Sequence, residues 1–184
     1  MWKKVEKMTM TDSYFSGSYH AKVDEKNRFV LPQELRYQLV DDGRLEFVIA
    51  LGMNGCLTIY KTGDMARIVE EFRKRQHVAK FQKFFTLFFS TLFHTTCDKI
   101  GRVMIPAVLK EAAQIESEIT LAGALSKIEI WPKKTYAAQL ESYLGSNEGT
   151  SEMQELMQEA FSLLSEETNG VVPEAAGEWK KIQI

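Results

Sequence analysis

The sequence has few cysteines and no long apolar run. Its 184 residues include two cysteines, Cys56 and Cys97, which form no CxxC pair and no ligand cluster with the three histidines. Such sparse thiols fit a reducing compartment, and we expect both side chains to serve packing rather than redox chemistry. The longest apolar stretch, FFTLFFSTLF, has ten residues, whereas a membrane span needs about 20. These absences predict a soluble, cytoplasmic protein with no membrane partner.

The motifs of common catalytic and ligand sites are also missing. We find no Ser/His/Asp order, no nucleotide-binding glycine loop and no HExxH. His20 and His94 have no third ligand at a suitable spacing, so a structural or surface role is favoured over a metal site, and assistance to a phosphate contact is a further alternative. The segment MWKKVEKMTM carries charge but lacks the apolar core of a secretory signal. We therefore expect no enzyme activity, no cofactor, no metal and no small-molecule substrate.

The sequence does contain one pattern twice. The stretches VDEKNRFVLP and CDKIGRVMIP lie 74 positions apart. The shared positions are Asp24 and Asp98, Arg28 and Arg102, Pro32 and Pro106, and, just upstream, His20 and His94. A motif that recurs at one offset in matching surroundings predicts a duplicated structural unit.

Both copies predict the order strand, strand, helix, strand, strand. The expected elements of the first copy are 18–23, 28–31, 32–40, 45–51 and 56–61, and those of the second are 92–97, 102–105, 106–115, 118–123 and 127–132. Pro32 and Pro106 suit the first helical position, where the missing N–H costs nothing. Some 45 residues are too few to bury a core alone, so we expect the two copies to pack as a pseudo-twofold pair.

Two helices are predicted between the copies and a third after the second copy. Segments 63–76 and 79–90 place apolar residues at helical spacing, and 134–144 resembles them. The phenylalanines of 79–90 indicate either an internal core or a subunit interface, with base stacking a weaker alternative. The basic cluster 73–75 is interpreted as a solvated helix end, where positive charge suits the dipole. A supporting contact to a nucleic acid is its alternative.

The last 40 residues differ in charge from the rest. From Gly145 onward there are eight Glu and two Lys, a net charge of −6, so residues 1–144 carry +4. We predict a flexible linker at 145–151, an amphipathic helix at 151–167 with Ser151 and Gln154 as a capping box, and a loose end from 169. This split permits a nucleic-acid partner, and our hypothesis is that the acidic extension competes with such a partner for the basic body.

The repeated Asp-x-x-[Asn/Gly]-Arg pattern predicts a tight turn. Asn27 and Gly101 are residue types that tolerate positive φ, as a three-residue hairpin connection requires after a type I turn. The aspartate can accept backbone N–H bonds and stiffen such a turn, so that the arginine leaves it at a fixed angle. Lys26 and Lys99 lie within the same turns.

Three roles are open for the paired Asp and Arg. They could be local ion pairs that brace the turn. The arginine could instead bind an anion, either a phosphate or the edge of guanine, where a bidentate contact discriminates by about 1–3 kcal/mol. The first two roles are compatible, because the aspartate can orient the arginine that binds. Catalysis is the least favoured role, since no partner base or nucleophile is present.

These motifs resemble the MraZ family of bacterial transcriptional regulators, which have two tandem AbrB-like units. The resemblance rests on the doubled DxxxR, on LGMNGCLTIY, FRKRQ and KFQKFF, and on KIEIW, and it covers about residues 15–144. It implies an α+β, mainly β fold, a double swapped-hairpin barrel with flanking helices. It also implies sequence-specific binding of double-stranded DNA, with short direct repeats as the target upstream of the division and cell-wall genes. The protein would act as a repressor, including of its own promoter. It would be associated with the nucleoid and would form a homo-oligomeric ring, most often an octamer.

The resemblance also assigns roles to residues. The implied DNA-binding set is Arg28, Arg102, Lys26, Lys99, Asn27 and Gly101, with Asp24 and Asp98 orienting the turns. The arginines would be the main contacts and the lysines neighbouring phosphate contacts.

The expected domain organisation has five parts. They are a flexible lead at 1–14, a first AbrB-like unit at 15–62, linking helices at 63–90, a second unit with its following helix at 91–144, and the acidic extension at 145–184.

Two rival functions remain. One is an oligomeric interaction protein in which DNA binding is secondary or lost. The other is an antitoxin, which usually carries one such unit per chain.

Overall fold

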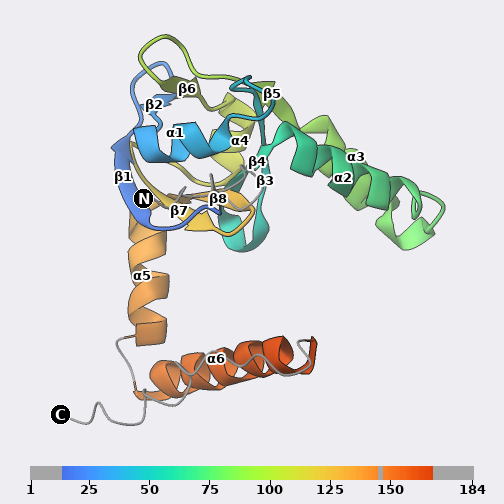
Figure 1. Cartoon of the computed structure of the whole chain (residues 1–184). Helices are drawn as coiled ribbons and strands as arrows, with labels where there is room; N and C mark the ends of the chain where they lie inside the picture. The colour runs from blue at the N-terminus through green and yellow to red at the C-terminus, as the bar shows by residue number, and fades with distance from the viewer. Residues whose placement is uncertain (1–13, 145–146, 168–184) are drawn as a thin grey trace, which may run out of the picture. The chain divides into compact units, whose positions relative to one another are not determined.

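The computed structural model describes residues 14–144 and 147–167, which divide into two compact units between Tyr136 and Ala137 (Figure 1). The expected lead at 1–14 (apart from Tyr14) and the loose end from 169 lie outside the described residues. The strands are β1 Ser18–Lys22, β2 Arg28–Val30, β3 Phe47–Leu51, β4 Leu57–Lys61, β5 Phe93–Thr95, β6 Arg102–Met104, β7 Glu118–Ala124 and β8 Lys127–Pro132. The helices are α1 Gln33–Leu39, α2 Thr62–Arg73, α3 Gln82–Ser90, α4 Ala107–Ala112, α5 Lys133–Leu144 and α6 Asn147–Glu167, with short 3-10 turns at Met53–Gly55 and Ala79–Phe81.

The larger sheet combines strands of both repeats. Its order is β1-β7-β8-β4-β3-β5, and β2 pairs separately with β6. The first strand of each repeat pairs with the other repeat, β1 with β7 and β5 with β3, always antiparallel. The central pair β4–β8 is symmetric as well, because Leu57 lies opposite Ile130 and Ile59 opposite Ile128. The expected pseudo-twofold packing of two repeats is therefore confirmed.

The α+β class with mainly antiparallel strands is confirmed, but the expected barrel is not. The six-stranded sheet is not a closed barrel, since β1 and β5 are its two edges and no ladder joins them within residues 14–144. The strands on either side of each turn also do not form a hairpin ladder with each other. After each turn the chain diverges, because β2 and β6 find their hydrogen-bonding partner in the other repeat.

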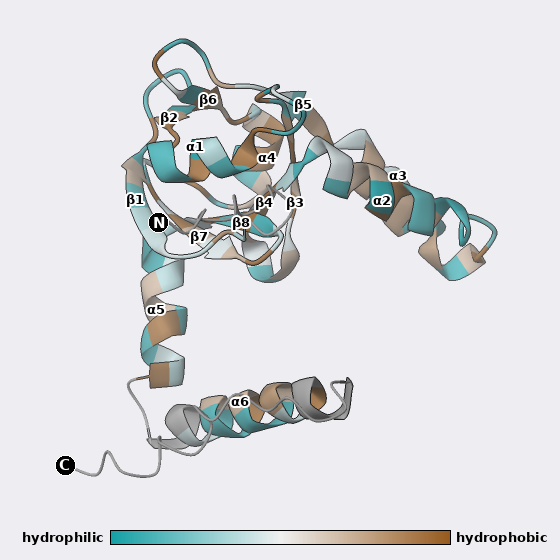
Figure 2. Ribbon diagram, viewed as in Figure 1, coloured by the Kyte–Doolittle hydropathy of each residue, from teal (hydrophilic) through white to brown (hydrophobic). Residues whose placement is uncertain are grey.

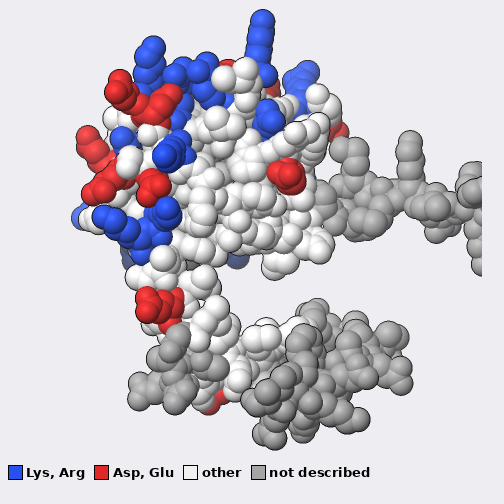
Figure 3. Space-filling view, turned by 90° about the vertical axis from the view of Figure 1, so that its left-hand side faces the viewer, with Lys and Arg blue, Asp and Glu red and all other residues white. Residues whose placement is uncertain are grey.

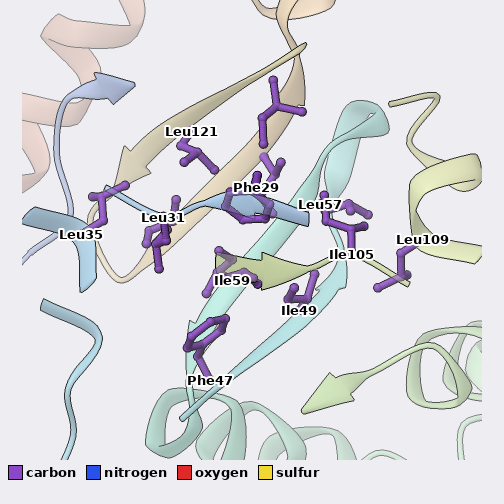
Figure 4. Close-up of a cluster of buried hydrophobic side chains, with 14 of the residues drawn as sticks. Phe29, Leu31, Leu35, Phe47, Ile49, Leu57, Ile59, Ile105, Leu109 and Leu121 are labelled. Atoms are coloured by element: carbon purple, nitrogen blue, oxygen red, sulfur yellow. The ribbon is translucent and has the colours of Figure 1, made fainter. Parts of the chain in front are cut away.

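Both members of the β2–β6 ribbon contribute to the main core. Phe29 and Val103 point inward and are buried, as are Leu31 and Ile105 just after the strands. Figure 4 shows Phe29 and Ile105 among side chains of the large sheet such as Leu121. The alternation of strand side chains leaves the other face of the ribbon outside. Burial of the inner face thus holds the ribbon on the sheet.

The first helix of each repeat also contributes to this core. Leu35, Leu39 and Leu109 are fully buried. Pro32 and Pro106 are the N-cap residues, so the helices begin one residue later than predicted, at Gln33 and Ala107. Proline at this junction still sets the entry of the chain into the helix, because its φ is fixed.

The phenylalanines between the repeats form an aromatic cluster of their own. The ring of Phe72 in α2 contacts four rings of α3 at centroid distances of 5.5–6.1 Å, and Figure 2 shows the apolar residues along α3. Phe88 also packs on the buried Met65 cluster. Internal packing of this stripe is therefore confirmed. Phe84 and Leu87 remain exposed, so an interface role remains compatible with the structure.

The basic cluster at the end of α2 is matched by acidic side chains on the same helix. Arg73 pairs with Glu70, while Lys74 and Arg75 pair with Glu71. This arrangement agrees with the interpretation of a solvated helix end. None of the described helices combines the length and the apolar character that crossing a membrane would require.

The unit at 137–184 contains the end of α5 and the long helix α6. The prediction of a flexible linker is wrong for 147–151, because α6 begins at Asn147, and Ser151 is not a cap. A single internal glycine costs only about 1 kcal/mol, which a helix of 21 residues can accommodate. The predicted amphipathic helix is confirmed, with exposed Leu156, Met157, Phe161 and Leu163.

Candidate nucleic-acid interface

The first turn is held by one carboxylate. Asn27 N–H donates to the carbonyl of Asp24 at 2.9 Å, and Asp24 N–H donates to the carbonyl of Arg28 at 2.8 Å. Oδ1 of Asp24 accepts the backbone N–H groups of Lys26 and Arg28 at 2.9 and 2.8 Å. Its Oδ2 accepts Nε and Nη2 of Arg28 at 2.9 and 2.7 Å. The expected ion pair therefore exists, and it fixes the guanidinium relative to the backbone.

The second turn repeats this geometry. Asp98 N–H donates to the carbonyl of Arg102 at 3.0 Å, and Gly101 N–H donates to that of Asp98 at 2.9 Å. Oδ1 of Asp98 accepts the N–H groups of Ile100 and Arg102 at 3.1 and 2.8 Å, and Oδ2 accepts Nε of Arg102 at 2.6 Å. The predicted positive φ is confirmed in both turns, with 57° at Asn27 and 87° at Gly101.

Both carboxylates are strongly stabilised in their charged form. The side-chain hydrogen bonds from Arg28, followed by its backbone N–H, lower the pKa of Asp24 from 3.8 to about 2. The backbone N–H of Arg102, followed by its guanidinium, lowers the pKa of Asp98. Charge-assisted bonds of this kind are short and directional. Each turn therefore presents its arginine in one orientation at neutral pH.

The fold brings the two turns together on one ribbon. Leu31 N–H donates to the carbonyl of Gly101 at 2.9 Å, and Ile105 N–H donates to that of Asn27 at 2.8 Å. The left-handed residue of each turn is thus bound by the strand that follows the other turn. Arg28 and Arg102 both lie on the outward side of the ribbon, since the inward positions between them are occupied by buried residues.

Basic side chains gather at this end of the molecule. Figure 3 shows many Lys and Arg side chains, with Asp and Glu among them, at the upper end of the view, where β2 and β6 lie in Figure 1. Lys26 and Lys99 are exposed in the two turns. The surface defined by the two turns and the outward face of the ribbon is called the ribbon surface below.

Two basic residues beside the turns were missed by the sequence analysis. Lys110 Nζ donates to Oδ1 of Asn27 at 2.9 Å. The guanidinium of Arg36 lies against Gly101, so closely that a Cβ there would meet it. Arg36 and Lys110 are separated by the same 74 positions as the turns. That offset was the signal that could have identified them as a further equivalent pair.

The remaining candidates have ordinary surroundings. Nδ1 of His20 lies 3.1 Å from Oγ1 of Thr120, and His94 is exposed on β5. Cys97 packs on the main core, where burial raises the pKa of its thiol to about 11, and Cys56 is buried beside Trp131. Residues 14–144 and 147–167 contain no group of three His, Cys, Asp or Glu side chains placed to hold a metal ion.

These features define a class of protein, a duplicated α+β chain whose two aspartate-braced arginines share one exposed ribbon. The chain belongs to the MraZ family, since the family model for the MraZ protein matches residues 14–87 and 88–158. The resemblance expected from the doubled motif is confirmed. The match also continues past residue 144, where the resemblance was expected to end, into α6.

Curated relatives extend over most of the chain. Proteins named "Transcriptional regulator MraZ" from Clostridium acetobutylicum and Clostridium beijerinckii are 34% and 36% identical over 145 and 144 residues, covering 77% of this chain and 98% of each relative. A protein of the same name from Cutibacterium acnes is 36% identical over 135 residues, covering 73% of this chain and 89% of the relative.

Proposed function

We propose that this protein is a DNA-binding transcriptional regulator that reads double-stranded DNA with the ribbon surface. The observation that supports this most directly is the pair of guanidinium groups, Arg28 and Arg102, each fixed by an aspartate on the same exposed ribbon. The names of the relatives favour the same function.

The chemistry of the ribbon surface suits the major groove. A two-stranded ribbon fits into that groove, and arginine is the commonest partner of guanine O6 and N7 there. The bonds from Arg28 to Asp24 use Nε and Nη2, which leaves the edge of the guanidinium that includes Nη1 to donate to a base. An arginine with one edge fixed loses less conformational entropy on binding than a mobile one.

The neighbouring groups have supporting roles in this proposal. Lys26 and Lys99 contact phosphates, Asn27 and Gly101 give the turns their left-handed residue, and Asp24 and Asp98 orient the arginines. In the domain organisation that we propose, each unit, 15–62 and 91–144, supplies one turn, with the helices of 63–90 between them.

Oligomerisation would multiply a modest contact. One ribbon can touch few bases, whereas several ribbons linked in a ring would bind spaced direct repeats with a high effective concentration. Phe81 and Phe84 of the aromatic cluster and the neighbouring Leu87 are exposed apolar residues, and they supply a subunit interface for this ring. We propose repression as the outcome, with the protein's own promoter and the division and cell-wall genes among the targets.

A titration of purified protein tests the site. The probe is the duplex upstream of the protein's own gene, with unrelated DNA as competitor at fixed salt. Loss of a bidentate arginine–guanine contact costs about 1–3 kcal/mol, so Arg28→Ala and Arg102→Ala should each weaken specific binding about fivefold to 150-fold per ribbon. Affinity should also fall steeply with salt, because phosphate contacts release counterions.

Arg67→Ala is the matched control, because Arg67 also pairs with an aspartate but lies on α2, with its side chain 82% exposed. This variant should bind as the wild type does, and all variants should keep the same oligomer in light scattering. Normal binding by both ribbon variants would contradict the proposed site.

An oligomeric interaction protein is the second candidate. The exposed apolar residues of α3 and α6 favour it, including Leu87 and Phe161. Assembly without specific DNA binding, in the wild type as well as in the variants, would favour this candidate.

A further inference from the structure

The outward face of the β2–β6 ribbon carries two apolar side chains beside the two arginines. Val30 is 52% exposed and Met104 is 47% exposed, whereas Phe29 and Val103 on the inward face are at most 1% exposed. The four outward positions of the ribbon are therefore two cations and two exposed apolar groups.

The register places each arginine directly opposite an apolar side chain. Arg28 lies opposite Met104, and Val30 lies opposite Arg102. Backbone bonds join Leu31 to Gly101 and Ile105 to Asn27, and hydrogen-bonded pairs alternate with non-hydrogen-bonded pairs along an antiparallel ladder. The two Arg–apolar pairs are therefore non-hydrogen-bonded pairs. Opposed side chains are closest at such positions, with Cα atoms about 4.5 Å apart.

Scattered exposed apolar residues are common on proteins and need no explanation singly. Here the duplication places them at equivalent positions, since Val30 and Met104 are separated by the same 74 residues as the arginines. The outward face of a half-buried antiparallel pair is usually polar. An apolar group that recurs next to a fixed cation in both repeats indicates a role on the ribbon surface itself.

We propose that Val30 and Met104 are specificity-determining residues that contact the C5-methyl groups of thymines next to the guanines bound by Arg102 and Arg28. This inference rests on the proposed function and deepens it. The thymine methyl is the apolar feature of the major groove, and successive bases are about 3.4 Å apart along a strand. The spacing of an opposed pair on the ribbon therefore spans about one to two base steps.

The two halves of the ribbon differ in how sharply they discriminate. Val30 is β-branched and stiff at χ1, whereas Met104 is unbranched and adapts its shape. The half with Val30 and Arg102 therefore prefers thymine more strongly than the half with Met104 and Arg28.

The cationic neighbours of both apolar groups favour DNA over an acidic protein surface, because the guanidinium groups also complement guanine in the groove.

The test starts with the full chain and a pool of randomised duplexes, from which the preferred site is selected. Each thymine of that site is then replaced by deoxyuridine, which lacks only the C5-methyl. Dissociation constants are measured for wild type, Val30→Ala and Met104→Ala. Met53→Ala is the control, because Met53 is an 81% exposed methionine in the turn between β3 and β4.

In wild type, deoxyuridine next to a guanine should weaken binding about fourfold per methyl, from the transfer free energy of one methyl group. Val30→Ala and Met104→Ala should each weaken binding to the thymine duplex and lose the discrimination at one position. Met53→Ala should behave as wild type. Val30→Thr, which keeps the shape of valine, should retain the fold and weaken the same discrimination.

Two outcomes would overturn this inference while the proposed function stands. One is a selected site in which no thymine methyl affects binding, and the other is full thymine–deoxyuridine discrimination in both alanine variants. A pool from which no sequence is selected, together with unchanged binding by Arg28→Ala and Arg102→Ala, would overturn the proposed function as well.

Discussion

Asp24 binds both the backbone and the side chain of Arg28 with a single carboxylate. Its Oδ1 accepts the Arg28 N–H at 2.8 Å, and its Oδ2 accepts Nη2 at 2.7 Å. Asp98 likewise accepts the Arg102 N–H with Oδ1 at 2.8 Å, and its Oδ2 accepts Nε of Arg102 at 2.6 Å. The turn geometry and the direction of the guanidinium therefore depend on the same group, and losing its charge should loosen both.

The first prediction concerns this coupling. Asp24→Asn keeps an oxygen for the backbone N–H groups but removes the charge that holds the guanidinium. We expect weaker specific DNA binding, by less than the loss from Arg28→Ala, because the arginine remains but becomes mobile. Fluorescence anisotropy measures this difference. Asp64→Asn is the matched control, since Asp64 pairs with an arginine on α2, and an equal loss there would contradict the prediction.

The second prediction concerns pH. The pKa of Asp24 in the folded protein is about 2, below its usual 3.8, mainly through hydrogen bonds from the Arg28 side chain. Because this pKa is lowered by folding, the charged carboxylate stabilises the folded state above pH 3.8, and that stabilisation is lost as the pH falls through about 2. The turn should therefore stay intact at pH 4. A carboxyl NMR titration should show the Asp24 midpoint near 2, and Arg28→Leu should move it towards 3.8.

That titration contains its own comparison. The pKa of Asp98 should also lie below its ordinary value and should be unaffected by Arg28→Leu, since its partner is Arg102. A wild-type midpoint near 3.8 for Asp24 would show that the ion pair does not persist in solution.

The third prediction concerns the left-handed residues. Gly101 has a φ of 87°, and a Cβ there would meet the guanidinium of Arg36. Gly101→Ala should therefore destabilise the fold by about 1–3 kcal/mol, measured by thermal unfolding. Asn27→Gly is the counterpart at a φ of 57°. This change removes the hydrogen bond from Lys110, but glycine adopts the same positive φ without strain. The free energy of unfolding should therefore change by no more than about 1 kcal/mol.

The guanidinium of Arg36 lies at the end of a flexible side chain and can move aside, so a cost for Gly101→Ala no greater than that for Asn27→Gly would contradict the backbone strain expected at this positive φ. A large cost for Asn27→Gly would instead show that the bond from Lys110 is a major support of the first turn.

The fourth prediction concerns the acidic extension. Residues 145–184 carry a net charge of −6 and residues 1–144 carry +4, so the extension should compete with DNA for the basic body. Truncation after Leu144 should raise DNA affinity, and more so at low salt, where screening is weak. Changing Glu152, Glu155 and Glu159 to Gln in the full chain should raise it in the same direction. No gain in either protein would contradict the competition.

Much of this molecule follows from its sequence. The doubled Asp-to-Arg spacing, together with Asn27 and Gly101, was enough to predict two turns with a left-handed fourth residue, because few residue types tolerate that conformation. Period-2 and helical patterns located the strands of both repeats and the helices between them. These signals are local, since they depend on residues within a few positions of each other.

The tertiary structure decided which strands pair. The sequence favoured a hairpin at each turn, yet β2 pairs with β6 and β1 with β7, because the partners that bury Phe29 and Val103 lie in the other repeat. No local pattern contains that information. The same holds for Arg36 and Lys110, which reach the turns of the opposite repeat.

By itself, the sequence determined the two turns, their arginines and the repeat, since each needs only residue types at short spacing. The tertiary structure alone determined that both arginines share one ribbon and that Val30 and Met104 lie beside them. The physical reason is that cross-strand register depends on burying one face of the ribbon, and the choice of that face fixes what the other face exposes.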